Sequence, residues 1–116
     1  MKTLLILNDP PYGTERSYNG LRLAHALSKL DDEEVKVFLL ADAVTCAVAG
    51  QKTPDGYYNL ERLLGAVIRH NAEVGLCGTC MDPRGLEEVD IVDGAHRSTM
   101  EQLADWTIWA DRVIAF

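Results

Sequence analysis

Short apolar runs alternate with amphipathic segments along the chain, and this alternation limits the folds that the chain can adopt. The runs are predicted strands, and they are Thr3–Leu7 (TLLIL), Val35–Leu40 (VKVFLL), Glu73–Leu76 and Arg112–Phe116. Their residues are mostly apolar instead of alternating with polar ones, which is typical of strands buried on both faces. Such strands, separated by helices, form a parallel sheet with helices on both faces. The pattern therefore predicts an α/β fold.

The segments between the strands carry the helical pattern. Apolar residues from Leu60 to Ile68 recur at the spacing of an amphipathic helix, and Asn59 precedes them as a predicted N-cap. Helices are also expected over residues 15–30 and, as a short one, over residues 41–49. Residues 95–97 predict a short additional strand, whereas residues 86–92 fit either a helical turn or a weak strand.

The last predicted helix follows the sequence Ser98–Glu101, which reads as a capping box. Its expected apolar face consists of Met100, Leu103, Ala104 and Ile108, and Trp106 and Trp109 widen that apolar arc. This is more apolar surface than one sheet face should need. Together with Tyr57 and Tyr58, it predicts an interface with other copies of the chain.

The composition indicates one globular domain over residues 1–116. Hydrophobic residues make up 47% of the chain, and its formal net charge of −7 argues against binding to nucleic acid or to an anionic membrane surface. No run approaches the roughly 18 apolar residues of a membrane span. The first apolar run is too short for a signal peptide, so we expect a cytoplasmic location. In that compartment we do not expect the three cysteines to form a disulfide framework.

Three segments are expected at the carboxyl ends of the strands, where open parallel sheets bind their ligands. They are Asn8–Gly13, Ala41–Cys46 and Cys77–Gly85. The last of them reads CGTCMDPRG and contains Cys77 and Cys80, three residues apart. Any chemistry of this cysteine pair would therefore take place at the functional edge of the sheet.

The cysteine pair has four interpretations. A zinc site needs about four ligands, and no second pair with ligand spacing exists in the chain. A thioredoxin-like dithiol uses the CxxC motif, but that motif usually lies near the first strand rather than after the third. Both thiols could instead pack as small apolar side chains. The fourth interpretation is a reactive thiolate at Cys77, stabilised by backbone N–H groups and Arg84, which binds a sulfane sulfur as a persulfide that Cys80 then releases.

Further polar residues are candidates for the walls of the same pocket. Asn8, Asp9, Thr45 and Arg84 are predicted to shape it, although Asn8 and Asp9 also suit a simple turn. Cys46 is interpreted as a buried structural thiol or as a third redox thiol. The isolated glycines form no phosphate-binding loop.

The window CGTCMDPRG resembles the DsrE/DsrF/TusD-like superfamily of small sulfur-relay proteins. Cys77 matches the family's sulfur-accepting cysteine, and Arg84-Gly85 matches the end of the same motif. The Ala-rich loop after the second strand and the C-terminal ADRVIAF extend the resemblance over nearly the whole chain. Cys80 departs from it, because many relatives have no thiol there. The resemblance implies a three-layer α/β/α sandwich around a mainly parallel sheet of about five strands, assembled as dimers, trimers or hexamers.

Together these observations predict a small cytoplasmic sulfur-handling protein, either a sulfurtransferase-like persulfide carrier or a thiol-redox protein. Cys77 would be the nucleophile and Cys80 the resolving thiol, with no cofactor and no metal. The expected partners are further copies of the chain, as a trimer or hexamer, and a sulfur-donor or sulfur-acceptor protein. The alternative is a non-catalytic oligomeric binding module whose cysteines are packed.

Overall fold

A computed structural model describes residues 1–54 and 58–116 of the chain. The sequence Asp55-Gly56, which is typical of a turn, and the predicted interface residue Tyr57 lie outside the described residues. The strands are β1 (Lys2–Leu7), β2 (Glu34–Leu39), β3 (Glu73–Cys77), β4 (Ala95–Ser98) and β5 (Arg112–Ala115). The helices are α1 (Arg16–Ser28), α2 (Leu60–Arg69), α3 (Gly78–Met81) and α4 (Met100–Trp109). Short 3-10 helices are η1 (Ala41–Ala47), η3 (Asp82–Arg84) and η4 (Glu88–Asp90).

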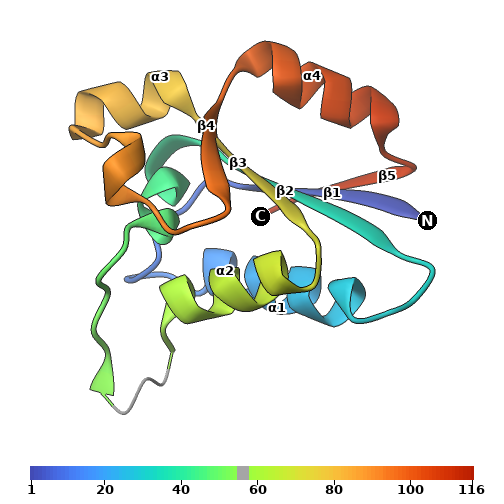
Figure 1. The fold of residues 1–116 in the computed structure, drawn as a ribbon, viewed down its shortest axis with the longest axis horizontal. Helices are drawn as coiled ribbons and strands as arrows, with labels where there is room; N and C mark the ends of the chain where they lie inside the picture. Colours follow the sequence, from blue (N-terminus) through green and yellow to red (C-terminus); the bar gives the residue numbers. More distant parts are fainter. Residues whose placement is uncertain (55–57) are drawn as a thin grey trace.

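The five strands form one sheet in the order β4-β3-β2-β1-β5, and every neighbouring pair is parallel. Helices α1 and α2 lie on one side of the sheet, and α4 lies on the other (Figure 1). The predicted α/β sandwich around a parallel sheet is therefore confirmed. Helix α3 continues directly from the carboxyl end of β3, which puts the cysteine pair at the edge that the sequence predicted.

The hydrophobic core follows the predicted apolar pattern closely. Leu60, Leu64 and Val67 on α2 are fully buried, and Asn59 caps this helix by accepting a hydrogen bond from the backbone N–H of Arg62. The central strands β1 and β2 are buried on both faces, as their apolar sequences require. No helix among the described residues is long and apolar enough to cross a membrane.

The beginning of α4 differs from the prediction. The N-cap is Thr99, whose side chain accepts from the backbone N–H of Gln102, and not Ser98. Ser98 is the last residue of β4 and pairs with Cys77 of β3, so its backbone is already committed to the sheet. Its buried hydroxyl donates to the Gln102 side chain at 2.8 Å. The predicted capping box at Ser98–Glu101 is therefore wrong by one residue.

The protein buries only part of the predicted apolar face of α4. Leu103 and Trp106 are buried, whereas Met100 and Ile108 are 59% and 84% exposed. The cause lies in β3, where Gly75 has no side chain and leaves room for an aromatic ring. A Cβ placed on Gly75 would lie 3.2 Å from the ring of Trp106, so this ring packs directly onto the strand. The helix is thereby turned so that part of its apolar surface points away from the sheet.

Two connecting segments, one predicted as a short helix and one left ambiguous, contain 3-10 helices. The predicted short helix after β2 is the 3-10 helix η1. The segment 86–92 contains η4 and then an antiparallel bridge between Val48 and Ile91. Both segments lie at the carboxyl ends of the strands and help to frame the region around α3.

Candidate functional site

Cys77 lies at the junction between β3 and α3. It is the last residue of the strand and the N-cap of the short helix. The Cys77 Sγ is 3.2 Å from the hydroxyl of Thr79. Burial alone would raise the pKa of the Cys77 thiol. The hydrogen bonds from the Cys80 thiol, the Thr79 hydroxyl and the backbone N–H groups of both residues outweigh it, so the pKa is lowered.

The pKa of Cys80 moves in the opposite direction. Burial raises the pKa of the Cys80 thiol, and the neighbouring Cys77 sulfur raises it further because it favours a proton on Cys80. The backbone N–H of Ala41 donates to Cys80 Sγ at 3.2 Å and only partly offsets these effects. Of the two thiols, Cys77 therefore loses its proton at the lower pH, and Cys80 keeps its proton to higher pH.

Ala41 shows how the loop after β2 reaches this site. Its φ angle is 50°, in the left-handed region that residues other than glycine seldom adopt. The conformation aims its N–H at the Cys80 sulfur. Backbone strain of this kind persists only where surrounding structure enforces it, and it concentrates at functional sites.

A cavity of about 180 Å³ opens beside Cys77. Its walls are Cys77, Gly78 and Thr79 together with residues 97–101 from the end of β4 and the start of α4. The Cys77 residue as a whole is only 4% exposed, and it forms part of the wall of this cavity. The guanidinium of Arg97 lies against Gly78, where an added Cβ would meet its Cζ at 2.7 Å. Arg97 also pairs with Asp82 through two hydrogen bonds of 2.7 and 3.1 Å and thereby lowers the pKa of that carboxyl.

Arg84 contacts Cys80 rather than Cys77. Its side chain donates to Asp42 at 2.7 and 3.0 Å and to the backbone carbonyl of Cys80 at 2.9 Å. It therefore ties the loop after β2 to the end of α3. Its positive charge acts to lower the pKa of the Cys80 thiol.

The other predicted pocket residues form bonds elsewhere at the same edge. The Asn8 side chain donates to the carbonyl of Phe116, and Thr45 donates to the carbonyl of Asp42 within η1. Asp9 accepts from Thr14 at 3.0 Å and pairs with Arg16 at 3.8 Å. These contacts organise the loops after β1 and β2, and none of them involves the sulfur of Cys77.

Cys46 lies in the core under η1. It is fully buried, and this burial raises the pKa of its thiol to about 12 despite a hydrogen bond from Ser17. Its Sγ makes one long contact of 3.7 Å with the carbonyl of Asp9. A thiol in this environment stays protonated, which fits the structural interpretation of Cys46.

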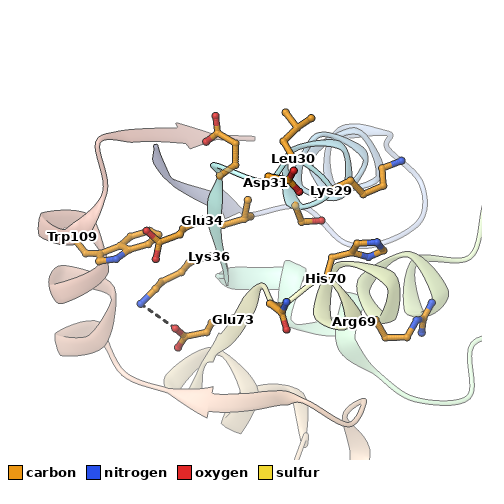
Figure 2. A pocket seen from close by; sticks show the side chains of 13 residues that line it. Lys29, Leu30, Asp31, Glu34, Lys36, Arg69, His70, Glu73 and Trp109 are labelled. Carbon is orange, nitrogen blue, oxygen red and sulfur yellow. Dashed lines mark ion pairs between the residues drawn. The ribbon is translucent and has the colours of Figure 1, made fainter.

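A larger cavity of about 490 Å³ lies at the opposite edge, near the amino ends of β2 and β3 (Figure 2). Its walls carry charges of both signs, and Lys36 already pairs with Glu73 at 3.2 Å. None of the three cysteines lines it. We locate the candidate site at the smaller cavity, because that one contains the thiol with the lowered pKa and lies at the ligand-binding edge of a parallel sheet.

Arg97 and the backbone N–H of Ala41 were not recognisable from the sequence as parts of the site. Arg97 comes from the short fourth strand, and only its pairing beside β3 brings it to Gly78. The glycine after Cys77 was the available signal, because a residue without a side chain often marks a close approach by another group. Within residues 1–54 and 58–116, no group of three or more His, Cys, Asp or Glu side chains is arranged to hold a metal ion.

Comparisons with known proteins agree on one family. A model of the family described as "DsrE/DsrF-like family" matches residues 1–116. Protein YchN of Escherichia coli K12 is 40% identical over 116 residues, covering 99% of this chain and 98% of YchN. An uncharacterised protein of Methanocaldococcus jannaschii is 38% identical over 116 residues and covers both chains completely, 100% of each.

Solved structures with the same fold include that of YchN. The crystal structure of YchN from Escherichia coli superposes with a TM-score of 0.92 at 40% identity, covering 99% of this chain and 98% of that one. A protein of unknown function from Methanobacterium thermoautotrophicum superposes with a TM-score of 0.75 at 10% identity, covering 99% and 97%. At that identity the second likeness concerns the fold alone.

Proposed function

The chain belongs to the DsrE/DsrF-like family, and from this premise we propose that it is a sulfur carrier that accepts a sulfane sulfur on Cys77 as a persulfide. The observation that supports the proposal most is the opposite shift of the two thiols. The pKa of Cys77 is lowered and the pKa of Cys80 is raised, although the two residues lie within one turn of chain. A thiolate is the nucleophile in sulfur exchange, so Cys77 is better suited than Cys80 to make the first attack on a donor.

The proposed loading step conserves atoms and electrons. The Cys77 thiolate attacks the outer sulfur of a donor R–S–SH and forms a new S–S bond. The S–S bond of the donor breaks, and its electron pair leaves with R–S⁻. The proton of the outer sulfur passes to that leaving group, which gives R–SH and Cys77–S–S⁻ without an oxidant or reductant.

The proposed release step uses Cys80. Its sulfur attacks Cys77–S–SH at the Cys77 sulfur, which forms a Cys77–Cys80 disulfide and expels H₂S. Neighbouring residues at this spacing on a helical turn are about 5–6 Å apart at Cβ, and disulfides form between Cα atoms up to about 7 Å apart. A dithiol reductant then restores both thiols. Transfer of the outer sulfur to an acceptor protein is the alternative outcome, and it leaves both cysteines reduced.

Cys80→Ser tests the division of roles between the two cysteines. The variant should still gain the mass of one sulfur atom on Cys77, because serine keeps a hydroxyl that can donate to the Cys77 sulfur. Its release of H₂S in the absence of an acceptor should be much slower, because no thiol remains to displace the outer sulfur. Intact-protein mass spectrometry over time measures both rates. Release at the wild-type rate would contradict the role of Cys80.

We also propose that copies of the chain associate through the exposed face of α4, as a trimer or hexamer. Met100, Ala104 and Ile108 recur at four-residue spacing, so they form one stripe along the helix. All three are exposed, and Val113 on the edge strand β5 is 44% exposed. Apolar surfaces of this kind on a small protein mark interfaces. The setting that we propose is the cytoplasm, with a sulfur-donor or sulfur-acceptor protein as a further partner.

Ile108→Glu should shift the protein to smaller species in sedimentation velocity, because it places a charge in the centre of the proposed contact. Val89→Glu is the matched control. Val89 is also 84% exposed but lies on η4, away from the stripe on α4. The control should sediment as the wild-type protein does. A wild-type protein that is monomeric at micromolar concentration would refute the proposed assembly.

A further inference from the structure

The cavity beside Cys77 is small. Its volume of about 180 Å³ corresponds to about six water molecules at about 30 Å³ each. Such a space can hold the head group of a small persulfide, whereas the rest of a longer donor would have to lie outside it. A donor of low molecular weight would therefore make most of its contacts within the cavity.

The cavity contains one cationic and one anionic side chain. Arg97 comes from the end of β4, and Glu101 comes from the first turn of α4. Asp82 takes two of the five N–H groups of the Arg97 guanidinium. Three N–H groups of the guanidinium remain, which is enough for a second carboxylate.

The charges around the cavity also discriminate between donors. Arg97, Asp82 and Glu101 sum to one negative charge, and the chain as a whole carries −7. A dianion such as thiosulfate would meet this excess of negative charge, whereas a zwitterion would pair its carboxylate with Arg97 and its ammonium with Glu101.

We propose that this cavity binds the α-amino-acid end of a small persulfide, such as cysteine persulfide, with Arg97 donating to its carboxylate and Glu101 accepting from its ammonium group. The inference rests on the proposed function, because it names the donor for sulfur transfer to Cys77. The bound donor presents its outer sulfur to the Cys77 thiolate. Attack there forms Cys77–S–S⁻ and releases the amino acid as its thiol, with the donor proton transferred to the departing sulfur.

The test compares four sulfur donors on the full-length protein by measuring the initial rate of sulfur addition to Cys77 by mass spectrometry. The donors are cysteine persulfide, mercaptopropionate persulfide, which lacks the ammonium group, cysteamine persulfide, which lacks the carboxylate, and inorganic polysulfide, which lacks both. Each rate is divided by the polysulfide rate of the same variant, so that a change in the reactivity of Cys77 itself cancels. Cysteine persulfide should react about tenfold faster than either truncated donor, the factor expected for one hydrogen bond to a charged group.

Variants assign this preference to the two side chains. Arg97→Gln should remove the advantage conferred by the carboxylate, and Glu101→Gln should remove the advantage conferred by the ammonium group. Arg62→Gln on α2 and Asp105→Asn, one turn along α4, are exposed controls that should keep the full preference.

The outcomes separate the two proposals. Equal normalised rates for all four donors, or a preference that survives both Arg97→Gln and Glu101→Gln, would overturn the donor assignment and leave sulfur acceptance by Cys77 intact. Failure of every donor, polysulfide included, to load Cys77 would overturn the proposed function together with the donor assignment.

Discussion

Cys77→Ser should abolish persulfide formation in the folded protein. Serine keeps the size and the hydrogen bonds of the side chain, but its hydroxyl does not ionise near neutral pH and is not a sulfur nucleophile. Neither of the other cysteines can replace Cys77. Burial raises the pKa of the Cys80 thiol, and this contribution remains in the variant, while burial raises the pKa of Cys46 to about 12. We expect sulfur addition to fall to the background rate of the unloaded protein.

Intact-protein mass spectrometry after incubation with inorganic polysulfide measures this loss, and peptide mapping locates the added sulfur. Cys46→Ala is the matched control, because Cys46 is buried away from the cavity and should not take part. Its sulfur addition should equal that of the wild-type protein. Sulfur added to Cys77→Ser at the wild-type rate would show that another residue is the acceptor.

Trp106→Ala should cost about 3–5 kcal/mol of unfolding free energy, as truncation of a buried tryptophan does. This is a large share of the roughly 5–15 kcal/mol that stabilises an ordinary domain. Trp106 is 4% exposed, meets Phe38 edge to face with the ring centroids 5.9 Å apart, and fills the space above Gly75. Since α4 buries only Leu103 and Trp106, the loss of this ring weakens the attachment of α4 to its sheet face.

Trp109→Ala provides the comparison for that prediction. Trp109 lies on the same helix, is only half-buried, and contacts Lys36 as a cation–π pair at 4.5 Å. Its removal should cost clearly less than the removal of Trp106. Urea unfolding followed by far-ultraviolet circular dichroism measures both variants without relying on tryptophan fluorescence. Equal losses in the two variants would contradict the account of how α4 is held.

The fold could be predicted from the sequence because its strongest signals are local. The first strand begins at Lys2 rather than Thr3, and the second covers Glu34–Leu39 rather than Val35–Leu40. Continuous apolar runs specify such strands whatever their neighbours are. The orientation of α4 could not be predicted this way, because it depends on Gly75 in another element, and the apolar arc of this helix is wide enough to fit two orientations.

The candidate site also has a part that could be predicted from the sequence and a part that could not. Its place at the carboxyl edge and the position of Cys77 after the third strand follow from chain order and from the rule for parallel sheets. The direction of each thiol's pKa shift does not follow from the spacing, because it depends on the burial of each sulfur and on the hydrogen bonds that Cys77 makes with the Cys80 and Thr79 side chains. Arg97 enters the cavity only through strand pairing. Contacts between distant segments of this kind leave no recognisable pattern in the local sequence.

The pH dependence of thiol alkylation tests the central claim, that Cys77 is a stabilised thiolate, most directly. Alkylation proceeds through the thiolate, so its rate rises with pH to a half-maximal point at the pKa of each thiol. In the native protein, peptide-resolved alkylation by iodoacetamide should give Cys77 a midpoint below that of Cys77 in the denatured protein, which serves as the reference at about 8.5. Cys80 should have a midpoint above its own denatured reference. A native midpoint for Cys77 at or above the denatured reference, or protection of Cys77 until the protein unfolds, would contradict the account.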